Sequence, residues 1–548
     1  MSISFKGVST EELGAAATSC GTLGPYGVAR QSASIPSGDG DPLDADVFHP
    51  ADGRQGPALL MRTAYGRGGF SDQGIYFASH GYHCVLQDTR GTSSYFHERS
   101  DGHAAAAWIA QQPWYDGNLG LFGTSYMGFT AYATAATRPA GLRALAVSAY
   151  STDRTSAWYP GGSFGLDLAL SWAASQAAPE ADRPGEGPGV NDSAFFALPL
   201  SAADRLYCAQ ELPFYQERLR FSGDSPHWAP LDFSHLLSED WLPPTLLIDG
   251  WNDYHRPYLW ADFLRLHARR RCDRIVTGPW SHDIDPIRSN LETLSWFERH
   301  LRHTTDHVGT ATAPVSVHIN PDVGWRELPT WPAPGSRAQR WYLAPGGTLE
   351  QARPTDSPEG HADRYRYDPA DPTPAVALAS FAPVDALTQT DNRELEARED
   401  VLTYTGDAFE TPVTLLGPVT AELWVTSSTP HTDFYARITD VHPDGRSLAI
   451  AQTLQRLSTE KLTDPSAPLH LTLDLGPVAH RLAPAHRLRL QIASGAHPFY
   501  ARNLGTGEDL PHATTMTAAD QTIHYGDATH PSGITVRIDD GTDSQSPG

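Results

Sequence analysis

One serine stands in a setting that could make it a nucleophile. Ser125 lies within Leu121-Phe-Gly-Thr-Ser-Tyr-Met-Gly128, directly after an apolar run and directly before a helix-like stretch. A sharp turn from strand to helix needs small neighbours, here Gly123 and Gly128, and it exposes the hydroxyl while aiming the next backbone N–H at a developing oxyanion. The usual form of this turn has glycine where this chain has Met127. The motif predicts a serine nucleophile, and by itself an ordinary strand–helix turn is an equal alternative.

Three further polar residues follow short apolar runs that predict strands. These are Tyr65, Asp253 and His282. In open α/β sheets the ligand crevice lies beyond the carboxyl ends of the strands, so side chains far apart in sequence can converge there. The chain order Ser125, Asp253, His282 is that of an α/β-hydrolase triad. Taken singly, the three could be a core aromatic, a turn residue and one of 24 histidines; their joint occurrence at strand ends favours a site.

The chemistry that these residues predict is acyl transfer. His282 would take the Ser125 proton as general base and return it to the leaving group, while Asp253 would hold the imidazole tautomer and stabilise the imidazolium. The Tyr65 hydroxyl and the Tyr126 backbone N–H would donate to the oxyanion. The expected intermediate is an acyl-enzyme.

The elements that must position these residues follow from hydrophobic periodicity. Short apolar runs alternate with helical stretches before residue 149 and again after 241, which predicts a parallel sheet covered by helices. The Trp- and Pro-rich stretch between them predicts an inserted helical cap. After about residue 345 the period changes to two, which predicts a β-sandwich or jelly roll. The expected domains are a discontinuous α/β-hydrolase domain (1–148 and 242–345), the cap (149–241) and the jelly roll (346–548).

Composition excludes several classes of function. The chain has 548 residues, with 40 Lys and Arg against 64 Asp and Glu, a net charge of −24. Such a surface would be repelled from nucleic acid or an anionic membrane. Neither of the lysines, Lys6 and Lys461, lies in a phosphate-binding loop. The four cysteines show no zinc spacing and no long apolar run occurs. We expect a soluble cytoplasmic protein with no metal, no cofactor and no nucleic-acid or membrane partner; a homodimer is left open.

Several sequence blocks carry a resemblance to a known family. They are Arg62-Thr-Ala-Tyr65, Gln87-Asp-Thr-Arg-Gly91, Gln112-Pro-Trp-Tyr-Asp-Gly-Asn118, Gly123-Thr-Ser-Tyr-Met-Gly128, Asp249-Gly-Trp-Asn-Asp253, Gly278-Pro-Trp-Ser-His282, Tyr367-Asp-Pro-Ala-Asp-Pro372, Asp440-Val-His-Pro-Asp-Gly445 and His486-Arg-Leu-Arg-Leu-Gln-Ile492. They resemble the bacterial CocE/NonD group, the cocaine esterase-like enzymes, which belongs with the Xaa-Pro dipeptidyl-peptidases and α-amino acid ester hydrolases of peptidase family S15.

The resemblance covers about residues 26 to 540. It implies an α/β-hydrolase with a helical cap and a C-terminal jelly roll. It also implies Ser125, Asp253 and His282 as the triad, with Tyr65 and Tyr126 as oxyanion donors. The nucleophile motif of the family is Gly-x-Ser-Tyr-x-Gly, which accounts for the methionine after Tyr126.

The residues that follow Asp253 indicate which kind of acyl group the enzyme would accept. A free α-ammonium needs carboxylates close by, because burying an unpaired cation is costly, and the α-amino ester hydrolase branch has acidic residues there. This chain has Tyr254, His255 and Arg256 after Asp253, which suits an aromatic, neutral or anionic acyl group. Trp172, in the cap, is either an aromatic wall of the pocket or part of the core of the cap.

The leading hypothesis is a serine hydrolase that cleaves an ester, or less readily an amide, of a small molecule. One alternative is an exopeptidase of the Xaa-Pro dipeptidyl-peptidase or aminopeptidase type, and another is acyl transfer to an alcohol or amine in biosynthesis. A non-catalytic alternative is a carbohydrate-binding jelly roll that carries an inert hydrolase domain.

Overall fold

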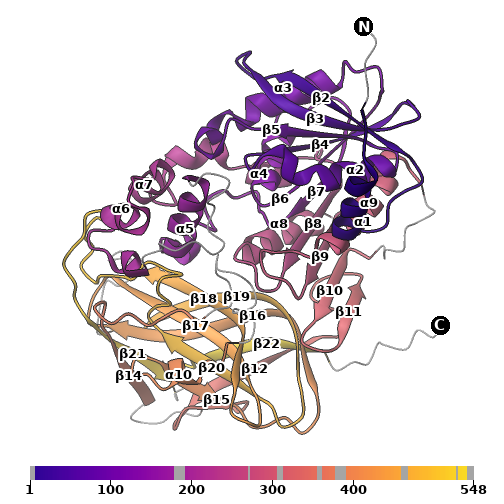
Figure 1. Ribbon diagram of the computed structural model, residues 1–548. Coiled ribbons are helices and arrows are strands. Elements are labelled where there is room, and N and C mark those ends of the chain that lie inside the picture. The colour runs from indigo at the N-terminus through magenta and orange to yellow at the C-terminus, as the bar shows by residue number, and fades with distance from the viewer. Residues whose placement is uncertain are drawn as a thin grey trace. The chain divides into compact units, whose positions relative to one another are not determined.

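The computed structural model divides into two compact units (Figure 1). The α/β unit comprises Met1–Arg154, His227–Trp251 and Tyr258–Ser316, and the β-rich unit comprises Thr155–Pro226, Asn252–Pro257 and Val317–Gly548. The structure describes residues 6–177, 192–269, 272–304, 313–354, 361–376, 390–457, 467–525 and 529–539.

The α/β unit is built on a sheet with the strand order β1-β2-β3-β5-β4-β6-β7-β8-β9. Pairing is antiparallel from β1 through β3 to β5 and parallel from β5 onward. Every residue of β4 and β8 is buried, as expected for parallel strands covered on both faces. The strands are β1 (Lys6–Gly7), β2 (Val28–Pro36), β3 (Pro42–Pro50), β4 (Gly56–Thr63), β5 (His83–Asp88), β6 (Tyr115–Thr124), β7 (Leu142–Ser148), β8 (Thr245–Gly250) and β9 (Arg274–Gly278).

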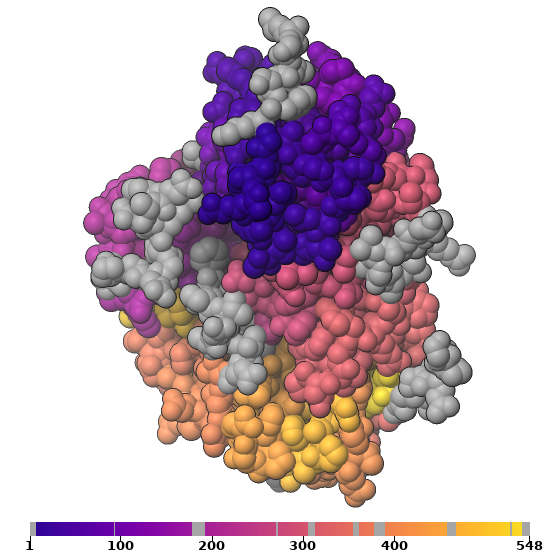
Figure 2. All heavy atoms as spheres, turned by 45° about the vertical axis from the view of Figure 1, so that its right-hand side comes forward, coloured from indigo at the N-terminus to yellow at the C-terminus, as the bar shows by residue number. Residues whose placement is uncertain are grey.

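Helices cover this sheet in two groups. Helices α1, α2 and α9 pack against one another, and α3 packs on α4, which lies over the central strands β4, β6 and β7. In Figure 2 the N-terminal part of this unit, in indigo, forms one continuous surface. The helices are α1 (Thr10–Cys20), α2 (Ser71–Ser79), α3 (Glu98–Ile109), α4 (Tyr126–Ala135), α8 (Arg256–Ala268) and α9 (Pro286–Leu301).

The β-rich unit is dominated by antiparallel strands. Their order is β14-β21-β16-β22-β12-β13-β15-β20-β17-β18, and β19 pairs with β16. The C-terminal elements are β10 (Val315–Ile319), β11 (Gly324–Leu328), β12 (Arg337–Ala344), β13 (Thr348–Glu350), β14 (His361–Tyr367), α10 (Arg393–Glu396), β15 (Leu402–Thr405), β16 (Val413–Ser427), β17 (Thr432–Val441), β18 (Ser447–Leu457), β19 (Leu469–Leu482), β20 (Arg487–Ala493), β21 (Ala519–Tyr525) and β22 (Gly533–Asp539).

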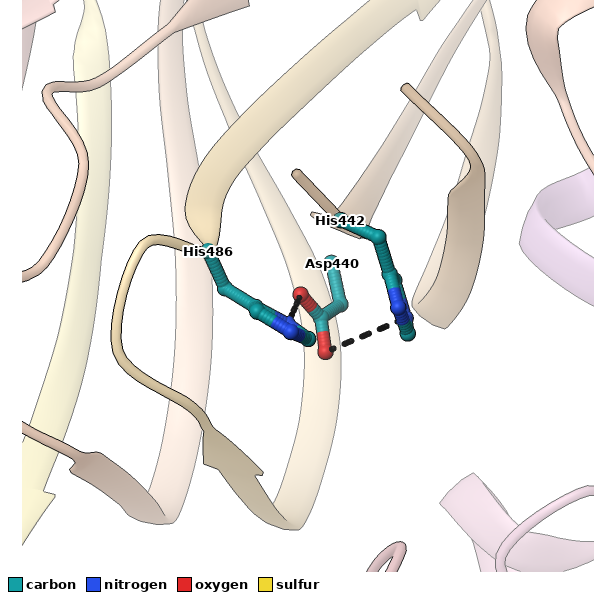
Figure 3. Close-up of side chains that lie close together, drawn as sticks. All are labelled: Asp440, His442 and His486. Atoms are coloured by element: carbon teal, nitrogen blue, oxygen red, sulfur yellow. Dashed lines mark hydrogen bonds and ion pairs between the residues drawn. The ribbon is translucent and has the colours of Figure 1, made fainter. Parts of the chain in front are cut away.

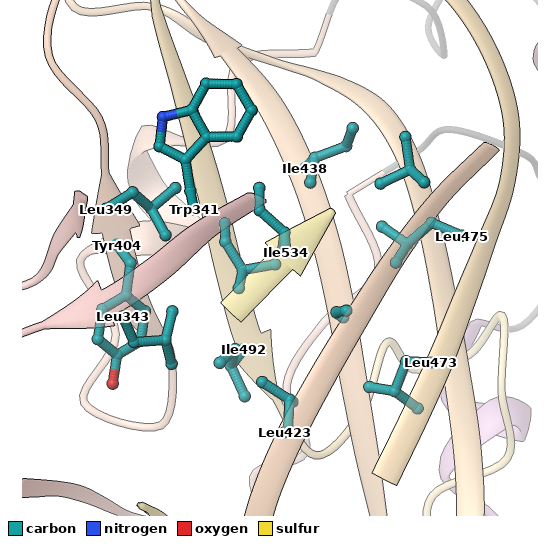
Figure 4. Close-up of a cluster of buried hydrophobic side chains, with 14 of the residues drawn as sticks. Trp341, Leu343, Leu349, Tyr404, Leu423, Ile438, Leu473, Leu475, Ile492 and Ile534 are labelled. Carbon is teal, nitrogen blue, oxygen red and sulfur yellow. The ribbon is translucent and has the colours of Figure 1, made fainter. Parts of the chain in front are cut away.

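The core of these strands follows from alternation along the chain. In β16, Val419, Ala421, Leu423 and Val425 are fully buried while the residues between them are partly exposed. Figure 4 shows such side chains meeting between the strands, among them Leu423 from β16, Ile438 from β17 and Leu473 from β19. Period-two burial of this kind is what an antiparallel sandwich needs.

The predicted cap is helical and packs on the jelly roll. Its helices are α5 (Leu166–Ala177), α6 (Ala203–Cys208) and α7 (Pro213–Arg220). The Asp167 N–H donates to the Pro498 carbonyl over 3.0 Å, and the Ala501 N–H donates to the Phe164 carbonyl over 2.7 Å. Backbone bonds therefore join the cap to the loop that follows β20.

The predicted fold class is confirmed: an α/β-hydrolase with an inserted helical cap and a C-terminal jelly roll. The first and last segments of the α/β unit end at Arg154 and Ser316, whereas the predicted boundaries of the hydrolase domain are 148 and 345. The division into three domains stays a prediction. Within the described residues, no helix combines the length and the apolar character that a membrane crossing requires.

Candidate active site

Ser125 occupies the turn between β6 and α4 in a backbone conformation that few residues adopt. Its φ is 57° and its ψ is −124°, a strained combination for a residue with a side chain. The turn is held on both sides, because the Ser125 N–H donates to the Ser148 carbonyl over 2.9 Å and the Ser125 carbonyl accepts from the Gly128 N–H over 2.8 Å. Strain of this kind, fixed by surrounding hydrogen bonds, is the geometry of a nucleophile elbow.

Two glycines allow the strand and the helix to approach at this turn. A Cβ on Gly123 would lie 2.4 Å from the Met127 Cβ and 2.5 Å from its carbonyl carbon, and one on Gly128 would lie 2.8 Å from the Val147 Cγ1. These separations are shorter than atoms tolerate, so glycine is required at both positions. Met127 is accommodated because its Cβ and carbonyl lie where Gly123 has no side chain.

His282 reaches the serine from the loop after β9. Its Nε2 lies 2.9 Å from the Ser125 Oγ, from which it can accept the hydroxyl proton. The loop continues into α9, where the Asp285 side chain caps the helix by accepting from the Ile287 N–H over 2.9 Å. The imidazole is therefore presented just before a capped helix start.

The ends of β8 and β9 are held together next to this loop. The Trp251 N–H donates to the Gly278 carbonyl over 2.9 Å. Trp280 packs so closely on both strand ends that a Cβ on Gly250 would lie 2.3 Å from the Trp280 carbonyl oxygen. The small residues thus let the His282 loop fold back over the sheet edge.

Tyr65 and Tyr126, the predicted oxyanion donors, meet through their rings. The ring centroids are 6.0 Å apart and the planes are at 66°. Tyr65 is half-buried beyond β4, and its N–H donates to the Thr63 Oγ1 over 3.0 Å. Tyr126 is the first residue of α4, so its backbone N–H belongs to the positive end of that helix. The Tyr65 ring thus packs on Tyr126, whose backbone N–H directly follows Ser125 in the turn.

A buried ion pair between Arg62 and Glu98 contacts the Tyr126 hydroxyl. Its hydroxyl donates to the Glu98 Oε1 over 2.9 Å, and the Glu98 Oε2 lies 2.9 Å from the Arg62 Nη1. The Arg62 Nε donates to the Gln87 side-chain oxygen over 2.8 Å. Burial raises the pKa of Glu98, although Arg62 and Tyr126 both favour its charged form. Sequence reasoning missed Glu98, since no local spacing links it to Arg62 or Tyr126.

Arg154 is a second buried cation beside α4. Its guanidinium lies 4.3 Å from the Phe129 ring centroid and 5.3 Å from that of Tyr95, and its Nη1 donates to the Tyr150 hydroxyl over 2.6 Å. Faces of aromatic rings attract cations, most strongly where water is excluded. Arg154 therefore ties α4 to the segment after β7, a role that sequence reasoning did not identify.

The remaining predicted site residues belong to the β-rich unit. Asp253 is buried, and its Oδ1 accepts from the His255 N–H over 2.8 Å. The rings of Tyr254 and His255 lie 4.7 Å apart between centroids. Arg256 is buried as well, and its Nη1 and Nη2 donate to two carbonyls of β19, those of Pro477 (3.2 Å) and Leu475 (3.3 Å). The contacts of Arg256 thus include an anchor on the jelly roll.

Trp172 lies in an aromatic cluster of the cap. Its ring centroid is 5.6 Å from that of Trp158 and 4.5 Å from that of Phe214, and it is 6% exposed. The structure thus brings Ser125 to His282 and Tyr65 to Tyr126 within the α/β unit. The predicted roles of these residues, of Asp253 and of the acyl-group residues stay predictions.

Comparison with known proteins shows similarity along nearly the whole chain. Residues 39–283 match the family described as X-Pro dipeptidyl-peptidase (S15 family), and residues 306–535 match the X-Pro dipeptidyl-peptidase C-terminal non-catalytic domain. Cocaine esterase of Rhodococcus sp. (strain MB1 Bresler) is 30% identical in an alignment of 578 positions that covers 94% of this chain and 99% of that protein.

Solved structures show the same fold. An aminopeptidase from the marine sediment archaeon Thaumarchaeota archaeon superposes with a TM-score of 0.79 at 19% identity, and an α-amino acid ester hydrolase does so with a TM-score of 0.78 at 20% identity. Each comparison covers 94% of this chain and 97% of the other. A CocE/NonD family hydrolase from Staphylococcus aureus gives a TM-score of 0.63 at 16% identity over 93% of this chain and 94% of its own.

Proposed function

Because the chain belongs to the S15 family of serine hydrolases, in its CocE/NonD group, we propose that it hydrolyses a carboxylic ester of a small molecule through an acyl-enzyme on Ser125. The observation that carries this proposal is the 2.9 Å separation between the His282 Nε2 and the Ser125 Oγ at a strained strand–helix turn. Family membership makes the protein a serine ester hydrolase in the broad sense; the residues and the substrate are the proposal.

In the first half-reaction the Ser125 Oγ attacks the ester carbonyl while its proton passes to the His282 Nε2. The carbonyl oxygen becomes an oxyanion, which the Tyr65 hydroxyl and the Tyr126 N–H stabilise. The intermediate collapses when the bond to the alkoxy oxygen breaks and His282 gives that oxygen its proton. In the second half-reaction water attacks the acyl-enzyme and gives its proton to His282. The acid is released when His282 returns that proton to the Ser125 Oγ.

Asp253 is the proposed third member of the triad. Its carboxylate would keep the His282 proton on Nδ1 and stabilise the imidazolium that forms twice in each turnover. The bond from the His255 N–H to the Asp253 Oδ1 supports this role, because it fixes the orientation of the carboxylate.

The proposed acyl group is aromatic, neutral or anionic. The residues that follow Asp253, namely Tyr254, His255 and Arg256, supply no carboxylate for an α-ammonium. A buried cation without a partner would cost far more than the roughly 2–7 kcal/mol of an unpaired neutral polar group. Trp172 is the proposed aromatic wall, although its contacts with Trp158 and Phe214 equally suit a role in the cap core.

A fluorophosphonate probe tests the nucleophile. The wild-type protein should be labelled at Ser125, with loss of activity toward an aryl ester in proportion to labelling. Ser125→Ala should neither react nor turn over substrate. Ser71→Ala is the matched control, because the Ser71 hydroxyl donates to the nearby Gly68 carbonyl at the start of α2, a local bond outside the proposed machinery. Labelling that persists in Ser125→Ala would refute the proposal.

Exopeptidase activity is the second candidate, favoured by the match of residues 39–283 to the X-Pro dipeptidyl-peptidase family. It uses the same nucleophile but needs an acidic group for the substrate N-terminus. A panel of acyl-varied aryl esters and one dipeptidyl-proline chromogen separates the two. Preference for the dipeptidyl substrate by a factor of about ten or more in kcat/KM would establish the peptidase.

A further inference from the structure

One aspartate and three histidines converge at one end of the jelly roll. Asp440 is the penultimate residue of β17, and His442 follows that strand directly; His480 lies in β19, and His486 directly precedes β20. Side chains of a strand alternate between its faces, so Asp440 shares the inner face with the core residue Ile438. The four residues therefore occupy the inner rim of the sandwich, where a hydrophobic residue would ordinarily stand.

The carboxylate of Asp440 lies among the imidazoles. Its Oδ1 is 2.7 Å from the His486 Nδ1, and its Oδ2 is 3.0 Å from the His480 Nε2 and 3.9 Å from the His442 Nε2. Figure 3 shows the Asp440 carboxylate linked to both His442 and His486, whose ring centroids are 4.2 Å apart. One ligand atom from each of Asp440, His442 and His486 lies within 4.8 Å of the others.

These distances are close to those of a metal site. Ligand atoms bound to one tetrahedral zinc at about 2.0–2.1 Å are about 3.3 Å from one another. Separations of up to 4.8 Å would have to shorten by about 1.5 Å or less, and the 2.7 Å separation between Asp440 and His486 would lengthen by about 0.6 Å. The His442 side chain is 20% exposed, so it can rotate without disturbing the core.

We propose that Asp440, His442 and His486 bind a divalent transition-metal ion of the zinc class. Two imidazole nitrogens and one carboxylate oxygen are ligands that Zn²⁺ accepts readily, and water would complete the tetrahedron. Since the ligands come from the turn after β17 and the turn before β20, the ion would cross-link two neighbouring turns of the jelly roll. This site is separate from the proposed esterase chemistry.

His480 would not bind the ion but would orient the Asp440 carboxylate that does. Ligating carboxylates are usually hydrogen-bonded by outer groups that fix their orientation. The His480 Nε2 is placed to donate to the Asp440 Oδ2, which leaves the Oδ1 for the ion. In this arrangement His486 turns its Nδ1 from the carboxylate to the metal.

One neighbour must move. His442 would bind through Nε2 and would then carry its proton on Nδ1, which lies 3.5 Å from the Arg446 Nη2. Two donors at that distance repel each other. The Arg446 Nε already donates to the Asp444 Oδ2 over 2.8 Å, so the guanidinium can swing toward Asp444 on the exposed turn.

The experiment measures metal in the full-length protein. Chelator-treated protein is titrated with Zn²⁺, and with Co²⁺ as an optical probe of coordination geometry. The expected result is one equivalent of tightly bound ion, a tetrahedral Co²⁺ spectrum and a higher unfolding temperature in the presence of Zn²⁺. His442→Ala and Asp440→Asn should lose the stoichiometric ion, whereas His480→Gln should weaken it by roughly 10–100-fold, as expected for an outer group.

The controls separate this site from other imidazoles. His512→Ala should bind as the wild type does, because His512 is exposed and pairs with Asp509 elsewhere in the unit. His442→Ala serves even where Asp440→Asn fails to fold, since retained esterase activity reports its folding. Tight binding that survives in His442→Ala, binding that disappears when Ser125 carries a phosphonate, or no stoichiometric binding in the wild type would each overturn the proposal.

Discussion

The rings of Tyr65 and Tyr126 meet edge to face, with their centroids 6.0 Å apart. Both residues are tyrosines and their rings are in contact, but each would donate a different hydrogen-bonding group to the oxyanion. Tyr65 would serve through its hydroxyl, whereas the Tyr126 hydroxyl is committed to Glu98 and only the backbone N–H of that residue would face the oxyanion. Phenylalanine substitutions therefore distinguish the two roles.

Tyr65→Phe should lower kcat by about 10²–10³ and leave KM nearly unchanged, because one oxyanion donor is lost in the transition state. Steady-state kinetics with an aryl ester measure both constants. Since Tyr65 is half-buried, the free energy of unfolding should change little. A kcat within threefold of the wild type would remove Tyr65 from the oxyanion hole.

Tyr126→Phe should show the reverse pattern. The backbone N–H remains, so kcat should stay within a few-fold of the wild type, while the buried Glu98 loses a donor at a cost of about 1–3 kcal/mol in the free energy of unfolding. Urea denaturation measures this loss. Equal effects of the two substitutions on kcat would contradict the assignment of separate roles.

Gly123→Ala should abolish activity and destabilise the fold, because the new Cβ would meet Met127 atoms at 2.4–2.6 Å. Gly14→Ala is the matched control: its Cβ would meet nothing within 4 Å, and the residue lies inside α1. The control should raise the free energy of unfolding by about 0.5–1 kcal/mol through helix propensity. Thermal unfolding and esterase assays of the two variants check both expectations.

The Arg62–Glu98 pair should be strongly coupled. Arg62→Met leaves a buried carboxylate without its cation, at a cost of about 3–5 kcal/mol in the free energy of unfolding. In Arg62→Met with Glu98→Gln neither charge of the pair remains, so the double variant should be more stable than Arg62→Met alone. A double-mutant cycle by urea denaturation measures the coupling, and strict additivity would show that the pair is not an energetic unit.

Asp262 should make stability depend on pH. Burial raises its pKa to about 7, against hydrogen bonds from the Thr152 N–H (2.6 Å) and hydroxyl (2.9 Å), which favour the carboxylate. The folded state therefore holds a proton that the unfolded state releases near its ordinary pKa of 3.8. This contribution is fully present below pH 3.8 and is lost as pH rises through about 7.

Asp262→Asn mimics the protonated form at every pH. The variant should match the wild type near pH 4 and exceed it at pH 8 by a few kcal/mol, because each tenfold change in proton affinity between the folded and unfolded states corresponds to about 1.4 kcal/mol. Urea denaturation across this range measures the difference. The exposed Asp322→Asn is the control; a variant that is less stable than the wild type at pH 8 would contradict the raised pKa.

The parts of the site that the sequence predicted are those with local signals. The strand–helix turn around Ser125 has glycines at fixed offsets, and the jelly roll has period-two burial along β16. Glu98 could not be found in this way, because its partner Arg62 lies 36 residues earlier and neither residue has a local pattern. Buried charges pair through tertiary packing, which periodicity does not record.

The cluster of Asp440, His442, His480 and His486 could not be found from the sequence for the same reason. The sequence predicted no metal site, because His442 and His486 belong to different turns at a spacing that resembles no zinc motif. Only the register of β17 and β20, which pairs Val441 with Arg487, makes the two histidines neighbours.

The anchor of Arg256 on β19 has a consequence for engineering by recombination. Arg256 stands three residues after Asp253 and is fixed by the carbonyls of Leu475 and Pro477. The segment that carries Asp253, the proposed triad acid, thus packs with the C-terminal half of the protein, although it lies in the middle of the sequence. A chimera that joins one relative's N-terminal half to another's jelly roll would have to keep residues 252–257 and the middle of β19 from the same parent.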